Sequence, residues 1–189
     1  MLCGRRKRLD VILLEHDKWL DTRGKEGKRA DLTAANLNGA CLSGADLREA
    51  YLNPADLRNA HLDGAHLTKA ALVGADLSQA HLRGADLRGA NLGGGNLHFA
   101  TLGGAHLNDV HLVGGDLTGA NLTSTDLRGA HLEGANLTGG YLIRANLWGA
   151  SYQPKQQPPM SSIAWAYGLG YLTRLCPTSS TGKRRDSPS

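Results

Sequence analysis

The chain has 189 residues, of which only 5% are aromatic, with a single Phe and as many as 25 Gly. A chain so poor in aromatic side chains is atypical of a conventional globular core, and no apolar run approaches the roughly 20 residues of a membrane span. Net charge is +4, with basic flanks around an acidic middle. Residues 1–29 hold nine Lys/Arg and five Asp/Glu, residues 30–150 hold seven Lys/Arg and eleven Asp/Glu, and residues 151–189 hold five Lys/Arg and one Asp/Glu. This distribution argues against direct nucleic-acid binding by the middle of the chain.

The cysteines and the N-terminus bear on the cellular location. The three cysteines have no paired spacing, which argues against a disulfide framework. The apolar run behind the basic N-terminus, Val11 to Leu14, is too short for a signal peptide. We therefore expect a cytoplasmic protein with no membrane association.

Residues 1–29 form a basic N-terminal segment in which residues 9–20 predict an amphipathic helix. Asp10 is placed to cap its start, and Gly24 follows its end. The apolar residues expected near one face are Leu9, Ile12, Leu13, Trp19 and Leu20.

Residues 30–152 contain an uninterrupted five-residue repeat. Every fifth residue from Leu32 to Leu147 is Leu, which gives 24 repeats, and the residue two places before each Leu is Ala in 19 of them. Ala and Leu two apart point the same way in an extended segment, and the two remaining residues must turn the chain. Each repeat therefore predicts one short side and one corner of a narrow solenoid filled with Ala and Leu.

Alternate repeats differ, so the true unit is ten residues. Between residues 44 and 114, the second residue after each Leu shows the difference. In the series 44, 54 and so on to 114 it is Gly in seven of eight positions, and in the series 49, 59 and so on to 109 it is Gly in one of seven. We expect the Gly-marked corners to have a positive φ, as in a type II turn, and the alternate corners to differ from them. A ten-residue alternation also requires an even number of sides.

Stretches such as Gly44-Ala45-Asp46-Leu47-Arg48 resemble the pentapeptide repeat family, whose motif is A-(D/N)-L-x-x. The resemblance covers about 120 of the 189 residues. It implies an all-β solenoid, a right-handed four-sided β-helix with 20 residues per coil and about six coils, or a rod roughly 29 Å long at ~4.8 Å per coil. Because the ends of a solenoid need covering, we interpret the N-terminal helix as its cap.

Residues 153–189 form a third segment: a Pro-containing linker, an apolar stretch and a basic tail that we expect to be disordered. The apolar stretch predicts a cap on the last coil or a homodimer contact at the C-terminal end. Its aromatic candidates for interaction are Trp165, Tyr167 and Tyr171.

Outward residues 20 apart stack in columns. The column beginning Cys41, His61 and His81 is the one that resembles a metal or thiol–imidazole site, and we expect it to be a solvated surface, with metal binding left open. A second column alternates Asp and His and has Arg beside it, which predicts exposed ion pairs. The filled interior offers no pocket for a substrate, so we expect no enzymatic activity and no cofactor.

Three functions remain from the sequence. The first is a rigid module that binds a protein partner, the second a DNA mimic that binds a type II topoisomerase such as gyrase, as the family resemblance allows, and the third a purely structural rod. The acidic stripe that a DNA mimic needs is only half charged here, with Asp56, Asp76 and Asp116 interrupted by Asn36, Asn96 and Asn136. We therefore favour the protein-binding module, with these three Asp residues as candidate contacts.

Overall fold

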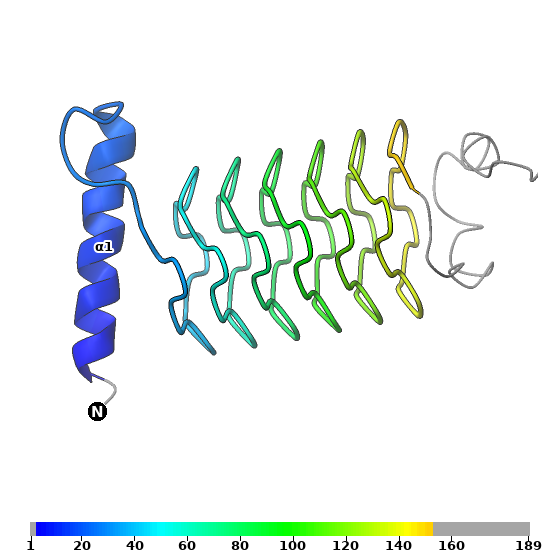
Figure 1. Cartoon of the computed structure of the whole chain (residues 1–189), viewed down its shortest axis with the longest axis horizontal. Coiled ribbons are helices and arrows are strands. Elements are labelled where there is room, and N and C mark those ends of the chain that lie inside the picture. Colours follow the sequence, from blue (N-terminus) through cyan, green and yellow to red (C-terminus); the bar gives the residue numbers. More distant parts are fainter. Residues whose placement is uncertain (1–2, 153–189) are drawn as a thin grey trace, which may run out of the picture.

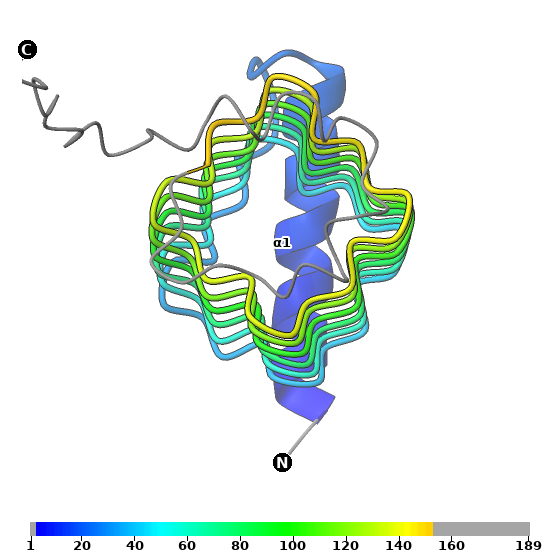
Figure 2. The same ribbon diagram turned by 90° about the vertical axis from the view of Figure 1, so that its right-hand side faces the viewer.

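The computed structural model describes residues 3–152, which form one helix and a parallel β-solenoid (Figure 1). Helix α1 (Cys3–Asp21) comes first. The chain then winds into stacked coils joined by isolated parallel bridges, each between residues 20 apart, from Asp31↔Tyr51 to His131↔Ser151. Twenty residues are four repeats, so each coil has four sides, as the view along the rod shows (Figure 2).

Each side carries an outward column of residues 20 apart. We number the faces by the first residue of this column: face 1 from Asp31, face 2 from Asn36, face 3 from Cys41 and face 4 from Asp46. Backbone hydrogen bonds such as Leu47 N–H to His66 O, 2.7 Å, fix the register between coils. Side chains in one column therefore lie at a constant spacing of ~4.8 Å.

The interior consists of the Leu and Ala columns, as the repeat predicts. Every Leu of the repeat is buried, and the most exposed of them, Leu147, has only 8% of its surface accessible. Thr125 replaces Ala in one repeat and is also buried. Its hydroxyl donates a hydrogen bond to the Leu122 carbonyl, so the polar group inside the core is satisfied.

The corners differ from the prediction. In each repeat the N–H of the residue at the Ala position bonds back to the Leu carbonyl three residues earlier, as Ala45 does to Leu42 at 3.1 Å. The residue just before this Ala position has a positive φ at fourteen corners where it is Gly. It also has a positive φ at nine corners where it is another residue, including Glu49 at 61°. The two corner series therefore share type II geometry, and the expectation that they differ is wrong. Only Pro54 departs among the corners, because its ring fixes a negative φ.

Helix α1 also differs from the prediction at its start. It begins at Cys3, so Asp10 lies inside the helix and does not cap it. The preceding residues are mostly Arg and Lys, which favour helix and extend it. The end is as expected: Gly24 N–H bonds to the Trp19 carbonyl at 2.7 Å, with Arg23 in the left-handed region.

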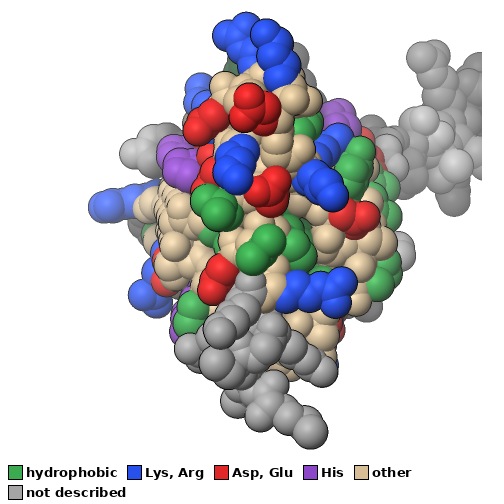
Figure 3. All heavy atoms as spheres, turned by 90° about the vertical axis from the view of Figure 1, so that its left-hand side faces the viewer, with side chains coloured by type: hydrophobic (Ala, Val, Ile, Leu, Met, Phe, Trp, Pro, Cys, Tyr) green, Lys and Arg blue, Asp and Glu red, His purple; other side chains and the backbone are tan. Residues whose placement is uncertain are grey.

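Helix α1 lies across the open end of the first coil (Figure 2). Leu9, Ile12 and Leu13 pack against the solenoid core. From the α1 end, basic, acidic and hydrophobic side chains are interspersed rather than gathered by type (Figure 3). Within residues 3–152, no helix is long and apolar enough to cross a membrane.

Candidate interaction faces

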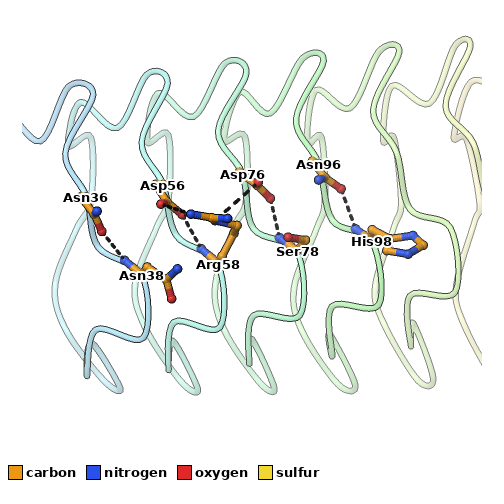
Figure 4. Close-up of polar contacts among 8 residues, drawn as sticks. All are labelled: Asn36, Asn38, Asp56, Arg58, Asp76, Ser78, Asn96 and His98. Carbon is orange, nitrogen blue, oxygen red and sulfur yellow. Dashed lines mark hydrogen bonds and ion pairs between the residues drawn. The ribbon is translucent and has the colours of Figure 1, made fainter.

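Face 2 carries the predicted acidic residues in one column, of which Figure 4 shows the part from Asn36 to Asn96. Bridges connect Asn36 to Asp56, Asp56 to Asp76, Asp76 to Asn96, and onward to Asp116. The structure therefore brings the three predicted Asp residues onto one face, but Asn96 separates Asp116 from the other two.

The side chains of this column have a structural task that the sequence reasoning missed. Each side-chain Oδ1 accepts a hydrogen bond from the backbone N–H two residues later, for example Ser78 N–H to Asp76 at 3.0 Å and Thr118 N–H to Asp116 at 3.0 Å. This is an Asx turn that leads into the corner. Asn serves the same purpose, as in Asn96 with His98 N–H at 3.0 Å, which explains why both Asp and Asn occur in the column.

One of the three charges on face 2 is largely neutralised. The Arg58 guanidinium forms hydrogen bonds of 2.8 and 2.7 Å to the Asp56 carboxylate, and its Nε lies 3.9 Å from Asp76 (Figure 4). These bonds hold the pKa of Asp56 below its usual value. The negative potential of face 2 therefore comes from Asp76 and Asp116 more than from Asp56.

Face 4 repeats the Asp–Arg pair. The sequence Asp-Leu-Arg places Arg two residues after Asp on the same side of the chain, and the pairs Asp46–Arg48, Asp86–Arg88 and Asp126–Arg128 are 2.5, 2.6 and 2.7 Å long. Hydrogen bonds from Arg lower the pKa of Asp86 and of Asp126 to about 2. The predicted exposed ion pairs are thus present on this face.

The surface is less smooth than expected. A hollow of about 470 Å³ lies on face 4, lined by residues that include His66, Asp86, His106 and Asn108. Buried Leu and Ala side chains occupy the interior, whereas the surface has this hollow, which contradicts the expectation of a rod without a pocket. The hollow is open and charged, so it does not shield a substrate from water.

The histidine columns contain stacked pairs. On face 3 the rings of His61 and His81 have centroids 4.9 Å apart, and on face 1 those of His111 and His131 are 4.6 Å apart. Cys41 is exposed. In residues 3–152 no group of three or more His, Cys, Asp or Glu side chains is arranged to hold a metal ion.

Phe99 is a candidate that sequence reasoning did not single out. It occupies the corner between faces 2 and 3, is 57% exposed and has a φ of 54°, which is unfavourable for a bulky side chain. Its ring lies over Gly119 of the next coil and 4.2 Å from the His98 ring. The signal in the sequence was a lone Phe, the only one in the chain, in a column with Gly at three other corners.

The predicted aromatic candidates Trp165, Tyr167 and Tyr171 lie outside the described residues, as does the rest of the segment 153–189. The predictions of a C-terminal cap, of a homodimer contact and of a disordered tail therefore stay predictions.

Comparison with known proteins identifies the repeat. The model of the family of pentapeptide repeats matches eight copies, over residues 24–49, 30–68, 70–109, 100–139 and 116–151. None of the curated proteins matches the chain.

Solved structures agree with this assignment. A pentapeptide repeat protein from the Arabidopsis thaliana thylakoid lumen is 39% identical, with 52% of this chain and 68% of that chain covered and a TM-score of 0.51. HetL, a pentapeptide repeat protein of the cyanobacterium Nostoc involved in heterocyst differentiation regulation, is 38% identical over 66% of this chain and 71% of its own, with a TM-score of 0.28. QnrB1, a plasmid-mediated fluoroquinolone resistance protein, is 19% identical over 65% and 64%, with a TM-score of 0.35, a likeness too weak for a functional argument. The chain belongs to the pentapeptide repeat family, whose fold is a right-handed quadrilateral β-helix.

Proposed function

We propose that the protein is a non-enzymatic, cytoplasmic module that binds a protein partner through face 2 and the corner beside it. In this proposal the solenoid has about six coils, and α1 caps its first coil. The single observation that carries the proposal is Phe99, an aromatic side chain that is 57% exposed at a corner of the rod.

The surroundings of Phe99 resemble the centre of a binding surface. Aromatic side chains dominate binding energy at protein interfaces and work best where neighbours hold them in place. The Phe99 ring lies beside the His98 ring and over Gly119. Asp76 and Asp116, on the same face, supply charge that would orient a basic partner surface.

The alternative function, a DNA mimic that binds a topoisomerase, is less well supported. A mimic of duplex DNA needs closely spaced negative charges, since DNA carries one charge per ~1.7 Å of its axis. On face 2 only three of the six residues in the column are Asp, the other three are Asn, and Arg58 neutralises Asp56. A purely structural rod, the third possibility, does not require an aromatic side chain that is 57% exposed.

The test is a quantitative comparison of proteins captured by matched variants. Full-length wild type, Phe99→Gly and Val113→Ala are used as bait in host lysate, with capture measured by mass spectrometry. Val113 is 48% exposed at the other corner of face 2, between His111 and Asp116, so its variant controls for the loss of an exposed apolar side chain away from Phe99. A partner lost at least tenfold with Phe99→Gly but retained with Val113→Ala supports the proposal. Capture profiles that are the same for both variants contradict it.

Asp76→Asn/Asp116→Asn provides a second arm. Asn keeps the acceptor of the Asx turn, so this variant removes charge from face 2 without removing the corner hydrogen bonds. If face 2 binds a basic surface, the partner identified above dissociates at a lower salt concentration from this variant than from wild type. An unchanged salt dependence places the binding surface elsewhere.

A further inference from the structure

The interface between α1 and the first coil contains a fully buried histidine. His16 has 0% of its surface exposed, one helical turn beyond Ile12 and Leu13 on the side of α1 that packs on the solenoid. Its Nδ1 accepts a hydrogen bond from the N–H of Ala30, the first residue of the repeat region, at 3.0 Å. Its Nε2 is buried without a hydrogen-bond partner. The imidazole is therefore the polar link between the helix and the solenoid.

The hydrogen bond determines the protonation state. An imidazole nitrogen that accepts a hydrogen bond carries no proton, so docked His16 is neutral with its proton on Nε2. Protonation would place a second N–H at Nδ1, facing the Ala30 N–H. The Ala30 bond would be lost, and a positive charge would be buried between the helix and the coil.

The charged groups around His16 do not remove this conflict. Asp17 from α1 and Asp46 from the first coil favour the protonated form, as does the backbone of Arg48, whereas Arg29 from the connecting segment disfavours it. The Trp19 ring stacks on the imidazole, with centroids 5.7 Å apart and planes 12° from parallel. Burial outweighs the favourable groups and lowers the pKa of His16 from its usual value of 6.5.

We propose that His16 is a pH-sensitive latch, which holds α1 on the first coil when neutral and loosens it when protonated. The undocked helix exposes His16 to water, where its pKa returns to about 6.5. Docking therefore has its full strength above this pH and weakens as the pH falls below it, because the undocked state binds the proton more tightly. Undocking uncovers the first edge of the solenoid with Leu32 and Leu37, which lie beside Leu9 and Ile12 of α1.

Amide hydrogen exchange of the full chain, followed by NMR at pH 7.5 and pH 5.5, tests the latch. The Lys28 N–H reports docking independently of the imidazole, because it bonds to the Glu15 carbonyl of α1 at 3.0 Å. The Leu87 N–H, bonded to His106 O in the middle of the rod at 2.8 Å, is the internal control. After correction for intrinsic exchange rates, we expect the protection of Lys28 to fall by up to about tenfold at pH 5.5, while that of Leu87 changes much less.

His16→Asn is the matched variant, because its side-chain oxygen replaces Nδ1 as acceptor but does not titrate. The fall in Lys28 protection should disappear in this variant. An equal fall in both proteins, or no fall in wild type, overturns the proposal. Should the variant fail to dock at all, direct NMR titration of the wild-type His16 ring decides: a midpoint below 6.5 supports the latch, and one at or above 6.5 overturns it.

Discussion

The Arg58 guanidinium is anchored on the Asp56 carboxylate and leans towards Asp76, the next residue of the column, at 3.9 Å. One cation thus offsets the only two adjacent Asp residues of face 2. The column is weaker as an acidic stripe than its residue types suggest.

This arrangement predicts weak or no inhibition of gyrase supercoiling at low micromolar protein and ordinary ionic strength. A competitor of DNA for a basic groove depends on electrostatic attraction, which salt screens. A supercoiling assay over a range of salt concentrations measures it. Potent inhibition that Asp56→Asn/Asp76→Asn/Asp116→Asn abolishes would reverse our ranking and favour the DNA mimic.

The second prediction compares an inward with an outward residue. Leu87 is completely buried, whereas His81 lies in the outward column of face 3. Leu87→Ala should cost about 2–5 kcal/mol of stability and Leu87→Asp more, because a buried charge has no partner there. His81→Asp should change the stability by about 0.5 kcal/mol or less. Thermal unfolding followed by circular dichroism measures all three, and equal melting temperatures for Leu87→Asp and His81→Asp would refute the inward assignment.

The repeat pattern was sufficient to predict the parts of the fold that depend on regular spacing. Leu every fifth residue fixes which side chains face inward, and the family resemblance supplied the four sides. Corner geometry was harder to predict, because residues such as Glu49 adopt a positive φ when the hydrogen bonds of neighbouring coils impose it. The start of α1 was missed because a helix of favourable residues needs no cap at Asp10.

Only part of the candidate site was predicted, because regular spacing shows which residues share a face but not what their side chains contact. Sequence spacing aligned Asp56, Asp76 and Asp116, and it placed Arg58 close by. It did not reveal that their oxygens accept backbone hydrogen bonds, since this depends on side-chain direction at each corner. His16 resembled an ordinary polar residue of a helix, and only the packing of α1 on the first coil shows that it is buried.

Acid should destabilise the rod through Asp86 and Asp126. Their pKa is about 2 in the folded chain because of Arg88 and Arg128, against 3.8 normally. Each therefore contributes stability that is present above about pH 4 and is lost as the pH falls towards 2, on the order of 1 kcal/mol once solvent screening is allowed for.

Urea unfolding from pH 7 to pH 2 measures this dependence, with Asp86→Asn/Asp126→Asn as the control. The variant keeps the acceptors for the Arg88 and Arg128 backbone N–H groups. It should be less stable than wild type at pH 7, and the two curves should converge near pH 2. Curves that stay parallel throughout would mean that these ion pairs contribute nothing.

The last prediction separates the stability of the corner at Phe99 from its proposed use. Gly accepts a φ of 54° without strain, so Phe99→Gly should leave the free energy of unfolding unchanged or raise it by up to about 1 kcal/mol. The opposite change, Gly119→Ala, places a methyl group against the Phe99 ring at a corner with a φ of 66°, and should destabilise the rod by about 1 kcal/mol or more. Chemical denaturation of both variants measures the difference. If Phe99→Gly instead lost several kcal/mol, packing would explain Phe99, and this corner would have no binding role to account for.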